Sequence, residues 1–358
     1  MSLILKCPIN SLSFGNVAYN IIRQLHKKNI DTKIFPHGNV DISAFDKMEE
    51  GLKNWVQESI NNRYSKLDKD LPTLSLWHIN GSENRISKNQ NLLTFYETDE
   101  PTEQEKTLVN FQDHVFFSSS HAVDCFKDSC KNISFCPIGF DEDFCITDKQ
   151  YLPDDIIHFG LMGKYEKRKN HDLILKAWAD KYGDNNKFRL TCVIENPFFK
   201  KGELNQRLNI LFGGKTFSNI SFLPRLKTNS EVNDFLNAID IDLSGMSGAE
   251  GWNLPSFNST CLGKWSLVLN HTSHKDWANS ENAIMVEPSN KTLAHDGQFF
   301  NKGAPYNQGS INLFEQDAIN EAFEKAESLA KQKNKKGLDA ANKFSYSNTV
   351  DILLKSIM

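Results

Sequence analysis

Two successive series of short apolar runs, each alternating with amphipathic helical stretches, constrain the fold of this chain most strongly. The first series occupies residues 1–150 and the second occupies residues 151–339. Short runs of Val, Ile, Leu and Phe between turn residues are typical of buried strands, and their alternation with helices indicates a parallel sheet covered by helices. The chain is therefore expected to form two doubly wound α/β domains.

The spacing of apolar residues also predicts the individual elements. In the first series, strands are expected at 3–5, 32–35, 73–79, 92–96, 114–117 and 133–136, and helices at 17–25, 48–60, 102–110 and 121–130. Residues 141–155 lose this periodicity and gather acidic residues and a proline, which predicts a linker. The second series is expected at 156–161, 171–182, 188–194, 202–211, 220–223, 231–237, 239–244, 255–262, 266–270 and 283–286, before a helical tail at 317–332 and 337–357. Two such Rossmann-like units present the carboxyl ends of their strands to a shared cleft, where a ligand is expected to lie.

Length and composition exclude several classes of protein. The 358 residues suffice for about two domains, and 41 basic against 45 acidic residues give a formal net charge of −4, which argues against a nonspecific nucleic-acid coat. No apolar run reaches the length of a membrane span, and the first residues do not read as a signal peptide. The seven cysteines are dispersed and predict neither a disulfide framework nor a zinc site. A cytoplasmic protein without a membrane segment or a metal is expected.

The most informative stretch is glycine-rich and covers residues 244–255. Gly245, Gly248 and Gly251 let backbone amides approach a ligand, and Pro255 suits the first turn of a helix that follows. A helix start of this kind favours phosphate, and the adjacent Glu250 is able to accept hydrogen bonds from sugar hydroxyls. The alternative is a glycine-rich turn with a capping carboxylate.

At these residues the chain resembles a known family. The segment 250–268, EGWNLPSFNSTCLGKWSLV, is similar to the EGFGLPxxEAMAxGxPVV signature of the retaining glycosyltransferases of family 4. The segment 163–172, GKYEKRKNHD, is similar to the family's GRLxxEKGxD. Upstream, FYETD at 95–99, FSSSH at 117–121 and CPIGFD at 136–141 follow the order of FETD, VPSxFN and VPxGVD. The resemblance covers about residues 92–288.

This resemblance implies a fold and an activity. The fold is GT-B, with an acceptor domain at residues 1–150, a nucleotide-sugar domain at 151–339, and a last helix at about 340–358 that packs back on the first domain. The activity is transfer of a sugar from a nucleotide diphosphate sugar to a hydroxyl, with retention of configuration. The nucleotide sugar is the donor substrate, and neither a cofactor nor a metal is implied.

The resemblance also assigns roles to residues. It gives Lys164, Lys169 and Glu250 catalytic roles, with the two lysines opposite the diphosphate. Donor binding is expected from Gly163, Gly248, Ala249, Gly251, Trp252, Asn253, Leu254 and Asn258. The acceptor side is expected at Gly15, Asn16, His78, Glu97 and Asp99. The alternatives are a solvated basic loop around the two lysines, a buried structural histidine, and a helix cap for the two acids before Pro101.

Three departures from the signature bear on the donor. Asn258 replaces the glutamate that holds ribose, Asn253 replaces a glycine, and Lys164 replaces an arginine, so a two-pronged phosphate donor is lost. The sequence leaves the base of the nucleotide open. The expected acceptor is a saccharide or a lipid-linked sugar. The alternatives are a hydroxymethylated base in viral DNA, for which local basic clusters would be needed, and a non-catalytic protein that only binds nucleotide sugars.

Overall fold

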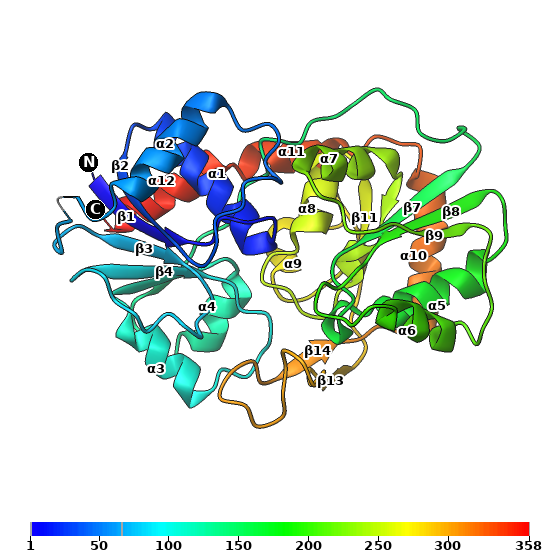
Figure 1. Ribbon diagram of the computed structural model, residues 1–358. Helices are drawn as coiled ribbons and strands as arrows, with labels where there is room; N and C mark the ends of the chain where they lie inside the picture. Colours follow the sequence, from blue (N-terminus) through cyan, green and yellow to red (C-terminus); the bar gives the residue numbers. More distant parts are fainter. Residues whose placement is uncertain (1, 66, 358) are drawn as a thin grey trace.

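Two six-stranded parallel sheets form the cores of two lobes in the computed structural model, which describes residues 2–65 and 67–357 (Figure 1). The first sheet has the order β2-β1-β3-β4-β5-β6. Its lobe contains β1 (Ser2–Cys7), α1 (Ser13–Lys27), β2 (Asp31–Pro36), α2 (Glu50–Asn61), β3 (Thr73–Leu76), β4 (Gln90–Thr94), α3 (Glu103–Phe111), β5 (His114–Phe117), α4 (Ser120–Phe126) and β6 (Ile133–Phe135). The predicted doubly wound α/β lobe is confirmed here.

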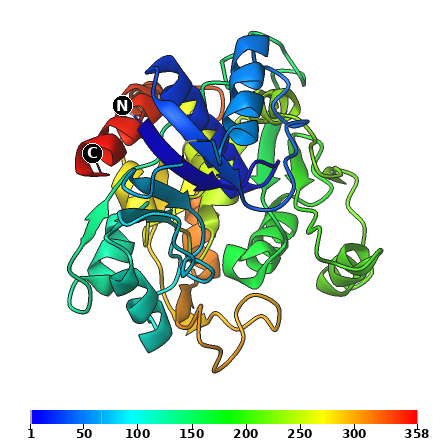
Figure 2. The same ribbon diagram turned by 60° about the vertical axis from the view of Figure 1, so that its left-hand side comes forward.

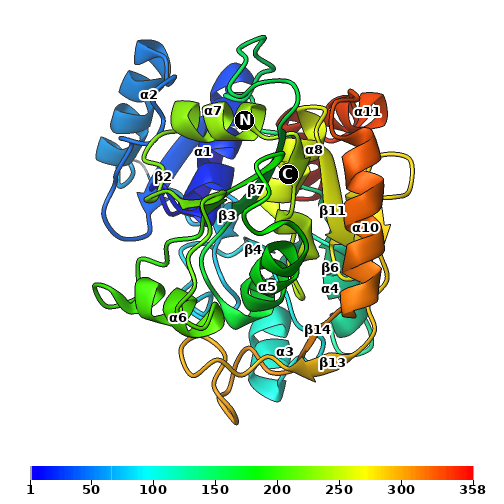
Figure 3. The same cartoon turned by 90° about the vertical axis from the view of Figure 1, so that its right-hand side faces the viewer.

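The second lobe repeats this architecture with the strand order β12-β11-β10-β7-β8-β9. It contains β7 (Ile157–Met162), η1 (Lys167–Lys169), α5 (His171–Tyr182), β8 (Phe188–Val193), α6 (Glu203–Leu211), β9 (Ile220–Phe222), α7 (Asn229–Ala238), β10 (Ile241–Asp242), η2 (Ser244–Met246), α8 (Leu254–Cys261), β11 (Trp265–Leu269), α9 (His274–Trp277), β12 (Ile284–Val286) and α10 (Gln316–Leu329). On one face of the sheet, Phe159 meets Trp178 and Tyr182 of α5 and Phe323 of α10. Figure 3 looks toward this lobe, with α10 along its side.

Several element boundaries differ from those expected, for local reasons. Helix α7 begins at Asn229 because Thr228 and Glu231 form a capping box, which fixes the first turn. The strand expected at 239–244 is only Ile241–Asp242, since the chain turns into η2 directly after it. The sequence did not predict the antiparallel hairpin of β13 (Lys291–Leu293) and β14 (Ser310–Asn312). The connection between these strands contacts the first lobe at Thr102 and Glu105.

The end of the chain returns to the first lobe through α11 (Lys335–Lys343) and α12 (Tyr346–Ile357). Helix α12 packs against α1, and Lys28 Nζ lies 2.8 Å from Asp351 Oδ1. Figure 2 shows the red C-terminal helix beside the blue N-terminal elements. No helix among residues 2–65 and 67–357 is both long and apolar enough to span a bilayer.

Direct contacts hold the two lobes together on the side of α8. Ser118 Oγ donates a hydrogen bond to the carbonyl of Gly251 at 2.7 Å, and Gly251 lies so close to Phe95 that an added Cβ would be 2.7 Å from Phe95 Cβ. Arg225 Nη2 of the second lobe donates a hydrogen bond to Ser11 Oγ of the first lobe at 2.6 Å. Gly251 therefore allows the two lobes to pack closely, because only a residue without a side chain fits against Phe95.

Candidate active site

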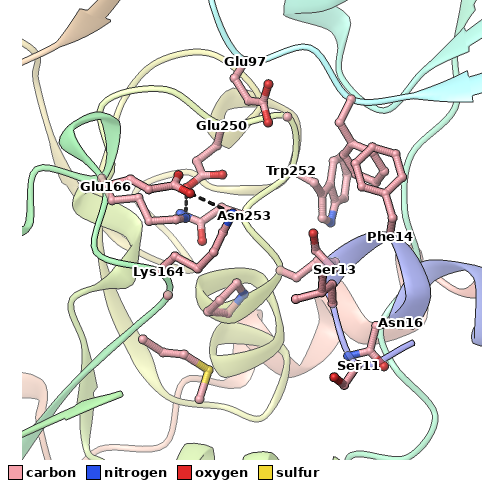
Figure 4. A pocket seen from close by; sticks show the side chains of 18 of the residues that line it. Ser11, Ser13, Phe14, Asn16, Glu97, Lys164, Glu166, Glu250, Trp252 and Asn253 are labelled. Carbon is pink, nitrogen blue, oxygen red and sulfur yellow. Dashed lines mark hydrogen bonds and ion pairs between the residues drawn. The ribbon is translucent and has the colours of Figure 1, made fainter. Parts of the chain in front are cut away.

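A cavity of about 480 Å³ lies between the lobes (Figure 4). Its walls come from the loops that follow β1, β3 and β4 in the first lobe and β7, β8, β9 and η2 in the second. These are the carboxyl ends of parallel strands, which is where ligands bind in open α/β sheets. The cavity therefore lies where the sequence predicts the ligand.

Most of the predicted site residues line this cavity. They are Gly163, Lys164, Lys169, Glu250, Gly251, Trp252, Asn253, Leu254 and Asn258 of the second lobe, and Asn16, His78 and Glu97 of the first. They come from segments far apart in the sequence. The fold therefore brings the predicted donor and acceptor sides to face each other.

The structure places Gly15, Asp99, Gly248 and Ala249 off the cavity, contrary to expectation. The amide of Gly248 donates to the Arg168 carbonyl at 2.6 Å, and the carbonyl of Ala249 accepts from Arg168 Nη1 at 2.8 Å. A Cβ on Gly15 would lie 2.0 Å from Asn10 O, so this glycine allows close packing at the start of α1. The Gly248 amide and the Ala249 carbonyl are therefore already engaged by Arg168.

Asp99 anchors the β13–β14 hairpin. Its carboxylate accepts hydrogen bonds from the Ser310 amide and from Lys291 Nζ, both at 2.7 Å. The connection of this hairpin continues to Asn307, whose amide donates to Glu105 Oε1 at 2.9 Å. Asp99 thus joins the first lobe to the hairpin and does not line the cavity between the lobes.

Five charged side chains form one continuous ion-pair network at the wall of the second lobe. Lys169 Nζ lies 2.5 Å from Glu250 Oε1, and Arg168 Nη1 lies 3.0 Å from Glu250 Oε2. Arg168 Nε reaches Glu166 Oε2 at 3.0 Å, and Lys164 Nζ reaches Glu166 Oε1 at 2.8 Å. All but Lys164 are nearly buried, and the three cations and two carboxylates leave one net positive charge. This wall suits an anion.

Neighbouring charges set the protonation of the carboxyl groups. Burial acts to raise the pKa of Glu250, but Lys169 and Arg168 outweigh it and hold that pKa well below its usual range. Burial raises the pKa of Glu97. The positive charge of Arg168 acts to lower this pKa, whereas the negative charges of Glu250 and Glu166 raise it further. The pKa values of Glu250 and Glu97, which both line the cavity, are therefore shifted in opposite directions, which is common in sites that move protons.

The turn that carries these cations is fixed to the glycine-rich stretch. Residues 167–169 form the 3₁₀ turn η1, which ends at Asn170 in a left-handed conformation with φ 55°. The Asn170 side chain donates to the carbonyls of Met246 and Asn312, each at 3.0 Å. Gly163, with φ 127°, packs against the Lys169 side chain, since an added Cβ would lie 3.3 Å from its Cδ. The position of Lys169 is thus preorganised.

The start of α8 faces the same cavity, and Asn253 precedes it with φ 67°. This left-handed conformation explains why the resembling signature has glycine at this position, and asparagine tolerates it best among other residues. His274 fixes the Asn253 side chain by a hydrogen bond. Its Nδ1 lies 2.8 Å from the Leu269 carbonyl and must carry the proton, so Nε2 accepts from Asn253 Nδ2 at 2.9 Å. Asn253 Nδ2 also donates to the Ser244 carbonyl at 2.9 Å.

Aromatic rings form the wall of the first lobe. The ring of Phe14 lies 5.0 Å from Phe95, 4.4 Å from His78 and 6.1 Å from Trp77, measured between centroids. Desolvation in the cavity, with the charges of Lys164 and Arg168, lowers the pKa of His78 to about 4, so this imidazole is neutral at pH 7. The wall offers flat apolar faces, with Glu97 as a neighbouring carboxyl.

Sequence reasoning missed several cavity residues. The sequence analysis gave Arg168 and Glu166 no role, although together they join Lys164 to Glu250. The single acid Glu166 within the otherwise basic run 164–169 was an available signal. Phe299 was missed because it arrives from the unpredicted hairpin, where Lys164 Nζ lies 4.9 Å from its ring centroid. Among residues 2–65 and 67–357, no cluster of three or more His, Cys, Asp or Glu is arranged to hold a metal.

Neither a family model nor a curated protein sequence matches this chain. Several solved structures resemble it over nearly the whole length of both chains. A sucrose-phosphate synthase from Thermosynechococcus elongatus has a TM-score of 0.70 and 11% identity, with 99% of this chain and 98% of that chain covered. HepE from Anabaena, in complex with UDP-glucose, has a TM-score of 0.63 and 12% identity, with 99% of each chain covered. WaaG, a glycosyltransferase involved in lipopolysaccharide biosynthesis, has a TM-score of 0.60 and 10% identity, with both chains fully covered.

These likenesses define the class of fold. Two parallel α/β lobes face one another across a central cavity, as the GT-B fold requires. The predicted GT-B fold is therefore confirmed. Identities of 10 to 12% show the fold alone, so the activity has to be argued from the cavity.

Proposed function

We propose that this protein is a glycosyltransferase that moves a sugar from a nucleotide diphosphate sugar to a hydroxyl acceptor. One observation carries the proposal: the Lys164 to Lys169 cation network and the start of α8 meet at the same cavity wall. Cations and a helix N-terminus are the groups that a diphosphate needs. The proposal is also supported by the fold that this chain shares with HepE, whose structure was solved in complex with UDP-glucose.

The proposed chemistry places the leaving group against this wall. As the bond between the sugar and the diphosphate breaks, negative charge grows on the diphosphate, and Lys164, Lys169 and the α8 amides would stabilise it. Preorganised donors of this kind each contribute roughly 10² to 10³ in rate. We assign the ribose to Asn258, whose Oδ1 is buried without a hydrogen-bond partner among the described residues and lies in the cavity wall.

We assign the transferred sugar to Glu250. Its Oε1 already accepts from Lys169 and from Ser247 Oγ, the latter at 2.8 Å, whereas Oε2 faces Arg168 alone within the described part of the chain. One lone pair of Oε2 is therefore available to a sugar hydroxyl. A carboxylate neutralised by two cations is a poor nucleophile, so the proposed transfer would not pass through a covalent Glu250 intermediate. Glu97, with its raised pKa, would hold the acceptor hydroxyl.

We propose a saccharide or a lipid-linked sugar as the acceptor. The flat rings of Phe14, Trp77 and Phe95 suit the apolar face of a sugar ring. Hydroxymethylated DNA is the other candidate, because the same rings would stack on an extruded base. The excess of positive charge is confined to the wall with Lys164 and Lys169. Over the whole lining, the four acids Glu97, Glu166, Glu195 and Glu250 equal the four cations Lys164, Arg168, Lys169 and Arg225 in number, which suits an extended phosphate backbone poorly. Binding to a hydroxymethylated duplex that weakens steeply with salt would favour DNA.

Turnover of labelled nucleotide sugars tests the proposal. Lys169→Ala and Glu250→Ala are each expected to lower transfer at least tenfold, whereas Lys176→Ala, on the exposed face of α5, leaves it unchanged. Unchanged turnover in both site variants would overturn the assignment. Tight binding of nucleotide sugars with neither transfer nor hydrolysis would instead support the non-catalytic alternative.

A further inference from the structure

Lys164 is the least confined cation of the ion-pair network. Its side chain is 35% exposed, whereas those of Arg168 and Lys169 are 11% and 10% exposed. A lysine ammonium sits on a flexible four-carbon stem and lacks the planar fork of arginine. The ion pair with Glu166, at 2.8 Å, restrains the ammonium from one side. Further contacts are needed if Lys164 is to meet a diphosphate in one fixed position.

Two phenylalanine rings supply these contacts. Lys164 Nζ lies 4.9 Å from the ring centroid of Phe299 and 5.4 Å from that of Phe198, and the two rings meet edge to face with centroids 5.1 Å apart. All three residues line the cavity. A ring face attracts a cation without neutralising its charge. Within the described part of the chain Nζ has one oxygen partner, from Glu166, so two of its three N–H groups are left for a ligand.

The turn that carries Phe299 is fixed by its own hydrogen bonds. Asp296 Oδ1 accepts from the amides of Gln298, Phe299 and Phe300, at 2.8, 2.9 and 2.9 Å. Phe300 is 5% exposed and packs in a small apolar cluster with Ala249 of the glycine-rich stretch. The ring of Phe299 therefore starts from a backbone with a defined conformation.

The connection between β13 and β14, which contains this turn, is attached to both lobes. In the second lobe, Lys167 Nζ donates to the Leu293 carbonyl at 2.8 Å. In the first lobe, Thr102 Oγ1 donates to the Pro305 carbonyl at 2.6 Å. Figure 1 shows the connection, in orange, running from the second lobe toward α3. Contacts on both sides thus hold Phe299 beside Lys164.

We infer that Phe299 is a positioning residue: its ring holds the Lys164 ammonium in place at the cavity wall to which the diphosphate of the donor is assigned. The inference rests on the proposed function. Phe299 acts through Lys164 and need not touch the donor. Phe198 is 53% exposed and therefore restrains the ammonium less than the partly buried Phe299 does. Phe299 lies beyond residues 92–288, so the family resemblance does not include this role.

Phe199 provides a matched control. Arg207 Cζ lies 4.7 Å from its ring centroid, which is a cation–π contact of the same kind in the same lobe. Phe199 is also partly buried, but it does not line the cavity. Phe199→Leu and Phe299→Leu therefore remove similar contacts, and only the second removes one from a cation of the cavity.

Calorimetry on the full chain, with the tightest binder among UDP, GDP, ADP and CDP, tests the inference. Phe299→Leu is expected to weaken diphosphate binding about two- to tenfold, and Lys164→Met at least as much. Phe299→Tyr keeps an aromatic face and is expected to lose less than twofold, and Phe199→Leu is expected to change nothing. In the Lys164→Met background, Phe299→Leu is expected to have no further effect, because the ring acts only through the ammonium. The same pattern is expected in kcat/KM for a nucleotide sugar.

The outcomes separate this inference from the proposed function. An undiminished loss from Phe299→Leu in the Lys164→Met background would overturn the inference, because the ring would then act on the ligand or on the fold directly. Unchanged affinity in Phe299→Leu would also overturn it, while diphosphates still bind. If none of the four diphosphates binds the unmodified protein, the proposed function itself fails, and the inference fails with it.

Discussion

The buried pair of Lys169 and Glu250 gives the sharpest prediction about stability. The two side chains are 10% and 7% exposed, and Nζ lies 2.5 Å from Oε1. Removing one partner of such a pair typically costs about 3–5 kcal/mol, because the other charge is left buried and unpaired. Arg168 still faces Glu250 Oε2 at 3.0 Å, so Lys169→Met is expected to cost about 3 kcal/mol, at the lower end of that range.

A double-mutant cycle isolates the pair. Glu250→Gln, Lys169→Met and the double variant are unfolded with urea at pH 7, and their free energies of unfolding are compared. The double variant is expected to be more stable than the sum of the single losses predicts, by about 1–3 kcal/mol, because neither charge is then left alone. Strictly additive losses, or a loss below about 1 kcal/mol in Lys169→Met, would refute the reasoning.

The pH dependence of this effect has a definite sign. The folded pKa of Glu250 lies below the unfolded value of about 4.3, so its ionisation stabilises the fold at every pH above that value. The stabilisation fades as the pH falls from there toward the folded pKa. The difference between the unmodified protein and Lys169→Met is therefore expected to be constant from pH 6 to 8 and to shrink below about pH 4.

Two further predictions concern the lobe contact and the cysteines. In Gly251→Ala the new Cβ would lie 2.7 Å from Phe95 Cβ, so we expect a loss of about 1–3 kcal/mol in thermal unfolding and at least tenfold slower transfer. Gly51→Ala in α2 meets no described atom within 4 Å and is expected to be neutral or stabilising; equal losses in both variants would contradict the lobe contact. Cys145 is exposed, whereas Cys192 is buried with a raised pKa, so mass spectrometry after brief alkylation is expected to find label on Cys145 and none on Cys192. Faster labelling of Cys192 would contradict its burial.

The fold and the location of the cavity were predictable because both depend on periodicity along the chain. Alternating apolar strands and helices impose parallel sheets, and parallel sheets bring the loops after their strands to one edge. Glu97, Lys169 and Glu250 follow three different strands, and all three line the cavity. The residues that follow strands in a pattern of this kind are those that sequence reasoning locates best.

The individual hydrogen bonds were not predictable, because their partners come from distant segments. The amide of Gly248 is engaged by the carbonyl of Arg168, eighty positions earlier, and Asp99 is engaged by Ser310 of an unexpected hairpin. A glycine-rich stretch predicts exposed amides, but only the packed structure decides which of them are already paired. Trp252 was expected to bind the donor because of its position in the signature. That its indole N–H has no partner among the described residues could be seen only in the structure.

A crystal structure with the nucleoside diphosphate that most raises the melting temperature would test the central claim most directly. The diphosphate is predicted to lie in the cavity between the lobes, at the start of α8, within hydrogen-bond distance of Lys164 Nζ and Lys169 Nζ. A diphosphate bound outside this cavity, or inside it but away from both ammonium groups, would contradict the account.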